Sequence, residues 1–256
     1  SNRVCFGTGK RVHLKSMKLI FNGTKGNIEP YSDLHLRHSV LTVEYRGMDV
    51  TIDCGAEWKD HLDELNPHAI VLTHAHPDHA GGLEEGSPCP VYATGTTWDL
   101  IEGFPIEEGH TLEDGTETEI RGIRFTPFPV EHSLRAPAVG YRIAAGEAAV
   151  FYAPDLVYIK DREKALTGVD VYIGDGATLV RSMVRKKGDR LFGHTPVRTQ
   201  LTWCQKFEIP QAVITHCGSG IVKNDREKNL RKLAELAGER GVDAVIAYDG
   251  MEMIVR

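Results

Sequence analysis

Residues 69–82 read AIVLTHAHPDHAGG, an almost wholly apolar run that leads directly into a cluster of metal-binding residue types. The apolar part, residues 69–73, fits a strand that is buried on both faces. Imidazole and carboxylate groups suit zinc, iron and manganese, and no soft sulfur ligand is needed. The cluster holds four such groups: His74, His76, Asp78 and His79. We therefore predict a metal site at the end of this strand; the alternative is a polar loop whose histidines bind nothing.

The spacing inside the cluster favours two ions. Side chains two residues apart point the same way in an extended segment, so His74 and His76 can contact one ion. Asp78 and His79 follow a proline and can turn toward a second ion. Three further candidates stand after other apolar runs, namely His132, Asp155 and His216. Each of these alone is more often an ordinary hydrogen-bonded group, so the three depend on their shared position at strand ends.

Length and composition describe an ordinary globular chain. The 256 residues suit one large domain or two small ones, and 41% are hydrophobic. The apolar runs are far shorter than the roughly 20 residues of a membrane helix, and residues 1–3 do not resemble a signal peptide. The net charge of −6 argues against a bulk nucleic-acid binder. Five scattered cysteines without a Cys-x-x-Cys pair argue against a disulfide scaffold, so we predict a cytoplasmic protein.

The chain reads as many short strands separated by Gly, Pro and Asp turns, with a few helices between them. Residues 1–16 look like an added or upstream extension, because residue 17 resembles a natural start followed by a strand. Residues 119–123 are among the expected strands. We predict helices over 59–65, 196–207 and 225–239, with Thr195 as the N-cap of the second. The candidate ligands all follow strands, as functional groups do in layered α/β proteins.

Residues 74–82 resemble the signature motif of the metallo-β-lactamase superfamily. Asp53, at the end of the strand in residues 48–52, resembles that superfamily's early aspartate. The superfamily also has a later histidine, aspartate and histidine in that order, which His132, Asp155 and His216 match. The resemblance covers nearly everything from residue 17 to residue 256. It implies an α/β (α+β) protein, a single domain over 17–256 with the four-layer αβ/βα sandwich.

The same resemblance implies a dinuclear site for two divalent ions, zinc or manganese, with iron as a further option. His74, His76 and His132 would hold one ion, and Asp78, His79 and His216 the second. Asp155 would bridge the two ions, which would share an activated water or hydroxide. Asp53 would orient a metal-bound imidazole; the alternative is a turn aspartate. We place Asp78 and Asp53 among the catalytic residues for these reasons.

Within the superfamily, the chain looks most similar to the phosphodiesterase branch. That branch includes tRNA 3′-processing nucleases and cyclic-phosphate phosphodiesterases. Residues 193–196 (GHTP) make His194 the candidate catalytic residue that is not a ligand, able to hold a phosphate oxygen or protonate the leaving group. The alternative for His194 is a surface histidine that caps a helix. Thr195 could add a hydroxyl contact to the substrate.

A basic stretch precedes His194, with cations at Arg181, Arg185, Lys186, Lys187 and Arg190. It reads either as a phosphate-binding loop, with Arg185, Lys186 and Lys187 as substrate contacts, or as an ordinary solvated face. Arg37 and His38 could also reach the cleft, although a surface position is the stronger expectation for both.

Three departures from the branch limit the transfer of a specific activity. The short interval between His132 and Asp155 leaves no room for a long tRNA-gripping arm. The scattered cysteines provide no cysteine-rich zinc site, and Lys25 replaces the second glycine of the first loop. We therefore expect hydrolysis of a phosphodiester, either a small or cyclic molecule or a nucleic-acid end.

The alternatives are an ester or lactone hydrolase that uses the same site and a non-catalytic, metal-bound binding or sensor protein. We expect no membrane partner. A homodimer is expected only by analogy with relatives.

Overall fold

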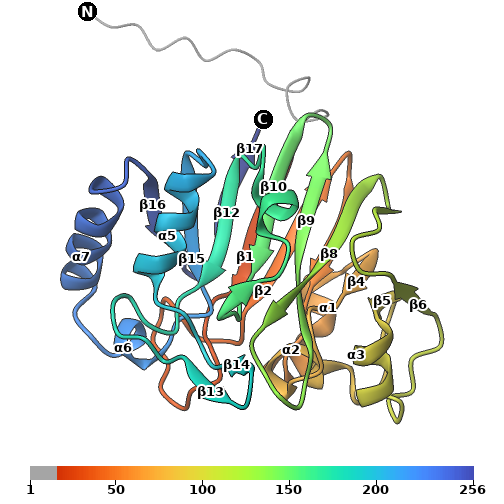
Figure 1. Cartoon of the computed structure of the whole chain (residues 1–256). Coiled ribbons are helices and arrows are strands. Elements are labelled where there is room, and N and C mark those ends of the chain that lie inside the picture. Colours follow the sequence, from red (N-terminus) through yellow and green to blue (C-terminus); the bar gives the residue numbers. More distant parts are fainter. Residues whose placement is uncertain (1–15) are drawn as a thin grey trace, which may run out of the picture.

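The computed structural model describes residues 16–256 (Figure 1). The expected extension, residues 1–16, lies outside the described residues except for Ser16. Two large β-sheets pack face to face at the centre, and helices lie on their outer sides. This arrangement confirms the predicted α/β class and the layered sandwich. No helix within residues 16–256 is long and apolar enough to cross a membrane.

The first sheet has seven strands in the order β17-β1-β2-β3-β4-β5-β6. Strands β3 to β6 run parallel to one another, whereas β17, β1, β2 and β3 pair in an antiparallel manner. The strands are β1 (Met17–Gly23), β2 (Val40–Tyr45), β3 (Met48–Ile52), β4 (Ala69–Val71), β5 (Val91–Thr94), β6 (Gly109–Leu112) and β17 (Met251–Val255).

The second sheet follows the order β11-β8-β9-β10-β12-β15-β16, and β7 adds to β8. Here β10, β12, β15 and β16 run parallel. The strands are β7 (Thr118–Ile120), β8 (Ile123–Glu131), β9 (Ala138–Ala145), β10 (Ala148–Ala153), β11 (Tyr158–Ile159), β12 (Val171–Asp175), β15 (Gln211–Thr215) and β16 (Asp243–Ile246). A separate hairpin joins β13 (Arg185–Lys187) to β14 (Arg190–Phe192).

The helices cover the outer faces of the two sheets. Those that pack on the first sheet are short, and α5 and α7 against the second sheet are longer. Early elements are η2 (Ala56–His61), α1 (Leu62–Leu65), α2 (Pro77–Ala80), η3 (Gly81–Leu83) and α3 (Gly95–Leu100). Later ones are α4 (Arg162–Leu166), α5 (Val197–Lys206), α6 (Ser219–Val222) and α7 (Arg226–Gly238).

Strand β10 shows why its sequence fits the middle of a sandwich. Alternate side chains of a strand point to opposite faces of its sheet. Val150 and Tyr152 therefore join the core between the sheets, whereas Phe151 and Ala153 join the core beneath the helices. All six residues of the strand are buried, and this double burial explains its nearly continuous apolar sequence.

Three sequence predictions need correction. The expected strand over 119–123 is broken, because Arg121 and Gly122 have φ values of 54° and 81° and turn the chain between β7 and β8. Thr195 is not the N-cap of α5, because the helix begins after Pro196 and has no side-chain cap. The helix over 59–65 is a 3-10 turn followed by the single turn α1.

Candidate functional site

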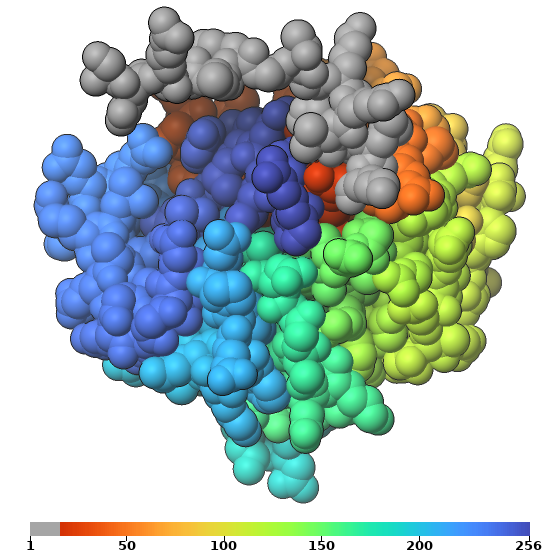
Figure 2. All heavy atoms as spheres, turned by 90° about the horizontal axis from the view of Figure 1, so that it is seen from above, coloured from red at the N-terminus to blue at the C-terminus, as the bar shows by residue number. Residues whose placement is uncertain are grey.

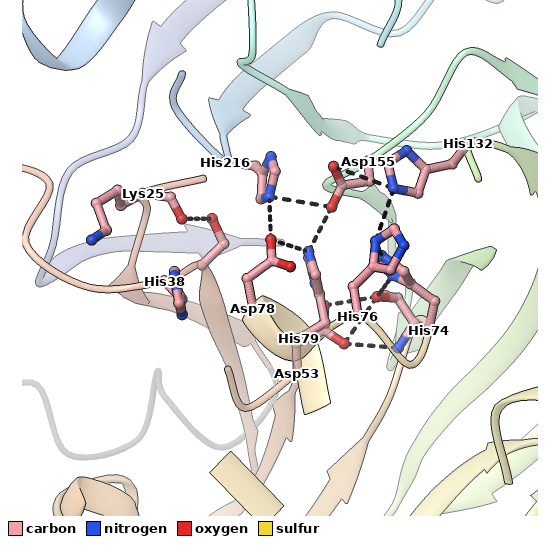
Figure 3. A network of polar contacts seen from close by, with 12 residues as sticks. Lys25, His38, Asp53, His74, His76, Asp78, His79, His132, Asp155 and His216 are labelled. Atoms are coloured by element: carbon pink, nitrogen blue, oxygen red, sulfur yellow. Dashed lines mark hydrogen bonds and ion pairs between the residues drawn. The ribbon is translucent and has the colours of Figure 1, made fainter. Parts of the chain in front are cut away.

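The residues predicted as metal ligands lie together at one edge of the two sheets (Figure 3). The carboxyl ends of parallel strands meet at the same edge, so residues that follow β4, β10 and β15 converge there. Their ligand atoms form two groups in which all distances are within 4.8 Å. One group is His74, His76 and His132; the other is Asp78, His79, Asp155 and His216.

Asp155 stands between the two groups. Its Oδ2 lies 2.6 Å from His79 Nε2 and 3.3 Å from His216 Nε2. Its Oδ1 lies 3.9 Å from the Nε2 atom of His132, which belongs to the other group. One carboxylate thus faces both sets of imidazoles, as a bridging ligand must.

Several buried atoms of this cluster have no hydrogen-bond partner within the described chain. They are Asp78 Oδ1, His79 Nε2, Asp155 Oδ2 and His216 Nδ1. Of these, His79 Nε2 and Asp155 Oδ2 lie 2.6 Å apart as an ion pair but form no hydrogen bond. Burying a polar atom without a partner costs free energy, so such atoms call for an explanation. Divalent cations would supply partners for the atoms of Asp78, His79 and Asp155, whereas His216 faces the cluster with Nε2. A set of nitrogen and oxygen donors suits zinc, manganese or iron. The residues present therefore fit a metal centre.

Asp53 orients one imidazole of the cluster, that of His79. Its Oδ2 accepts a hydrogen bond from His79 Nδ1 at 2.8 Å, which leaves Nε2 of that ring facing the site. Thr73 fixes the carboxylate by donating from its backbone nitrogen and from its hydroxyl, at 2.8 and 2.9 Å to Oδ1. Asp53 itself has a φ of 65°, a conformation that costs energy outside glycine and that these bonds hold in place.

The charges of the cluster are mutually dependent. Burial lowers the pKa of His79, but Asp78, Asp53 and Asp155 outweigh burial and raise that pKa well above its usual value. Burial raises the pKa of Asp78, but His79 and His216 outweigh it and hold that pKa well below its usual range. The carboxylate of Asp78 is therefore ionised at neutral pH and available to a cation.

The loop after β1 holds His216 from the other side. The backbone nitrogen of Cys217 donates to Thr24 O at 2.7 Å, and that of Gly26 donates to Cys217 O at 3.0 Å. A Cβ on Gly26 would lie 3.1 Å from the imidazole of His216, so the glycine allows the loop to pass this ring. His216 has a φ of 50°, and these contacts keep it in that uncommon conformation.

Lys25 anchors the same loop. Its side chain is only 3% exposed, and its ammonium group forms an ion pair with Glu57. Glu57 also accepts a hydrogen bond from the backbone nitrogen of His38 at 2.8 Å. Lys25 and His38 lie beside Asp78 in Figure 3. The residue that departs from the family loop is therefore part of the support of the site.

His194 lies beside the cluster and is held by a residue that the sequence analysis missed. Its Nδ1 is 2.7 Å from Asp175 Oδ2 and 3.4 Å from Asp155 Oδ1. Burial lowers the pKa of His194, but Asp175 outweighs it and raises the pKa to about 9. Asp175 ends β12 after an apolar run, just as Asp155 follows β10, and this pattern was the available signal.

Asp175 is fully buried and well supported. Its Oδ1 accepts from the backbone nitrogen of Ala177 at 2.8 Å, and its Oδ2 accepts from that of Leu156 at 3.1 Å. Gln200 accepts from the backbone nitrogen of Asp175 and donates to its carbonyl oxygen. The orientation of His194 is therefore fixed by a rigid carboxylate.

A pocket of about 550 Å³ opens onto the cluster. Gly26, His194, Arg181 and Met183 line it together with the ligands His76, Asp78, His132, Asp155 and His216. Thr195 is buried and is not among the residues that line it.

The other predicted cations lie outside this pocket. Arg185, Lys186 and Lys187 lie in the exposed strand β13. Arg37 forms an ion pair with Glu64, and His38 is buried.

Comparisons with known proteins identify the family and the fold of the chain. The family described as "Beta-lactamase superfamily domain" matches residues 49–217, well over half of the chain. A ribonuclease Z from Methanopyrus kandleri is 28% identical over 187 residues, which cover 62% of this chain and 62% of that protein. The chain thus matches less than two thirds of the length of this relative.

Two solved structures share the fold. The metallo-beta-lactamase fold protein YhfI from Bacillus subtilis has a TM-score of 0.73 at 16% identity, covering 94% of this chain and 99% of YhfI. A diphosphatase from the PhnP family has a TM-score of 0.67 at 19% identity, covering 93% of this chain and 97% of its own. At these identities the likeness concerns the fold.

Proposed function

This chain belongs to the β-lactamase superfamily, and we propose that it is a hydrolase that cleaves phosphodiesters with the help of two divalent metal ions. The observation that carries the proposal is the position of Asp155 between two groups of ligand atoms, at the base of a pocket that His194 also lines. The names of similar proteins, a ribonuclease Z and a diphosphatase, support a phosphorus-containing substrate.

The proposed metal ligands divide as the two groups do. His74, His76 and His132 would hold one ion, and Asp78, His79 and His216 the other, with Asp155 shared. Two ions held there would lower the pKa of a water molecule and polarise the bond under attack. Asp53 keeps the ring of His79 in the orientation that binding requires.

His194 is the proposed catalytic residue that does not bind metal. The carboxylate of Asp175 accepts a hydrogen bond from Nδ1, which leaves Nε2 for the substrate. Because the pKa of His194 is raised to about 9, its imidazole is protonated at neutral pH. A protonated ring can donate a hydrogen bond to a phosphate oxygen or give its proton to the leaving alkoxide. Arg181, which also lines the pocket, would offset phosphate charge.

The test compares three substrate classes on the same protein. Protein reloaded with zinc or manganese is given bis(p-nitrophenyl) phosphate, a p-nitrophenyl carboxylic ester and a lactone. His76→Ala and His194→Ala are the variants, and His110→Ala, a change at an exposed histidine outside the pocket, is the control. Metal content is measured for all four proteins.

We expect diester hydrolysis that His76→Ala and His194→Ala both abolish or reduce by at least about 100-fold. Only His76→Ala should also lose metal. Turnover of the ester or lactone without the diester would keep the metal site and overturn the substrate class. Bound metal with no turnover of any substrate would support the binding or sensor alternative instead.

A further inference from the structure

The β13–β14 hairpin forms a small sheet of its own beside the pocket. All four of its cations, Arg185, Lys186, Lys187 and Arg190, are exposed. The view from above in Figure 2 shows the cyan part of the chain, which includes this hairpin, projecting from the edge of the molecule. The hairpin is therefore free to contact a partner in solution.

The positive charge of the hairpin is not balanced locally. Within residues 16–256, no acidic side chain forms an ion pair with any of its four cations. The whole chain carries a net charge of −6, so the positive charge of the hairpin is opposite in sign to the net charge of the protein. Asp189, in the turn, is the one acidic residue between Arg185 and Phe192.

The pairing of the two strands adds to the repulsion. Lys187 lies directly opposite Arg190 in the register. Like charges in such positions destabilise a strand pair, and a two-stranded hairpin is only marginally stable by itself. An anion bound to the hairpin would offset this repulsion. The hairpin is therefore more stable with an anionic ligand than in contact with water alone.

The two ends of the hairpin are attached to the site. The backbone nitrogen of Met183 donates to His194 O at 3.2 Å, and that of Gly193 donates to His132 O at 2.8 Å. Gly193 has a φ of 102°, and a Cβ there would lie 2.3 Å from Met183 O, so the attachment needs glycine. The cations are thus held at a fixed place next to the pocket but outside it.

A small diester inside the pocket would meet Arg181 but none of the hairpin cations. Only a substrate that extends beyond the pocket can contact both Arg181 and the hairpin cations. We propose that the β13–β14 hairpin binds the phosphate backbone of a polynucleotide strand whose scissile phosphate lies in the pocket. The proposal rests on the proposed function and names its substrate class, because regularly spaced phosphates are the anions that the cations on one face of the hairpin, Arg185, Lys187 and Arg190, complement.

The test measures binding separately from turnover. Fluorescence anisotropy follows a labelled 12-nucleotide single-stranded RNA binding to the metal-loaded protein at several salt concentrations. The variant is Lys187→Glu with Arg190→Glu, two cations that lie opposite each other on one face of the hairpin. The control carries the same charge change at Lys206→Glu with Lys228→Glu, two exposed lysines of α5 and α7. Hydrolysis of bis(p-nitrophenyl) phosphate is measured in parallel.

We expect the hairpin variant to bind the RNA at least about tenfold more weakly, with the control pair close to wild type. The slope of log affinity against log salt should fall by about 1.4, since each phosphate contact on a single strand contributes about 0.7. Hydrolysis of the small diester should be unchanged. RNA binding that is lost without any change in the small-diester rate would separate the hairpin from the catalytic centre.

Equal losses in the two variants would overturn the proposal, because they would reflect net charge alone. Unchanged RNA binding, or hairpin-dependent binding of a poly-glutamate peptide in preference to RNA, would overturn it as well. Hairpin-dependent RNA binding by a protein that cleaves no diester would refute the proposed function and, with it, a scissile phosphate in the pocket, and would leave only the binding of the strand by the hairpin.

Discussion

Replacing Asp175 by asparagine tests how His194 is controlled. The change keeps the size of the side chain but removes the negative charge 2.7 Å from Nδ1. A hydrogen bond to a charged group contributes about 1.5–3 kcal/mol. At about 1.4 kcal/mol per pKa unit, this corresponds to a fall of roughly one to two units in the pKa of His194. Starting from about 9, that pKa should move to between about 7 and 8.

The sign of the effect on rate follows from the role of the protonated ring. A reaction that needs the protonated imidazole is lost as pH rises through its pKa. The alkaline limb of kcat/KM for diester hydrolysis should therefore shift to lower pH in Asp175→Asn. The variant should stay close to wild type near pH 6 and fall about 5- to 50-fold below it near pH 9.

The assay is the full pH profile with two substrates. If His194 protonates the leaving group, a diester with an alkyl leaving group should lose more than one with p-nitrophenolate, which leaves without a proton. Asp170→Asn is the matched control. Asp170 lies just before β12 and outside the pocket, and its carboxylate accepts a hydrogen bond from the backbone nitrogen of Ala149. An alkaline limb in Asp175→Asn that coincides with that of wild type would refute the reasoning.

Three further outcomes concern the metal site. Lys25→Met removes the ion-pair partner of Glu57 and so loosens the loop that holds His216. The variant should keep about one metal ion after dialysis, whereas Lys25→Arg should keep both. Metal analysis checks this, and retention of both ions in Lys25→Met, or loss of an ion in Lys25→Arg, would contradict it. Gly26→Val should also lose the second ion, because its side chain would displace the ring of His216; full metal content in that variant would argue against the contact. Chelation should lower the apparent stability by about 4 kcal/mol for each ion removed, relative to protein with free metal at 1,000 times Kd. Calorimetry with and without added zinc measures it, and an unchanged melting temperature would count against metal ligation.

The sequence predicted those parts of the site whose residues directly follow an apolar strand. The cluster of residues 74–79 follows one buried strand, so its chemistry and its position could be inferred together. His132, Asp155 and His216 follow other strands, and the structure brings them to the same edge. These three inferences needed the residue type, the strand end and the order of the later ligands in the family that the chain resembles. The zinc or manganese identity, the cytoplasmic location and the homodimer stay predictions.

Other features depend on contacts between distant segments. The ion pair of Lys25 and Glu57 joins residues 32 positions apart, and no local pattern marks either residue. Asp175 follows an apolar strand as Asp155 does but matched no motif, so nothing in the pattern connected it with His194. Thr195 looked like a helix cap by residue type, but Pro196 takes that position and Thr195 is buried.

The pairing of β17 with β1 has a consequence for how the molecule folds during synthesis. Met17 lies opposite Val255, so the two strands are separated by nearly the whole chain. The first sheet therefore cannot be completed while the nascent chain is still being extended toward residue 255. Closing so large a loop costs entropy before the contacts that reward it can form, which slows folding. The seven ligands would then gather around metal late, after translation has passed the last of them.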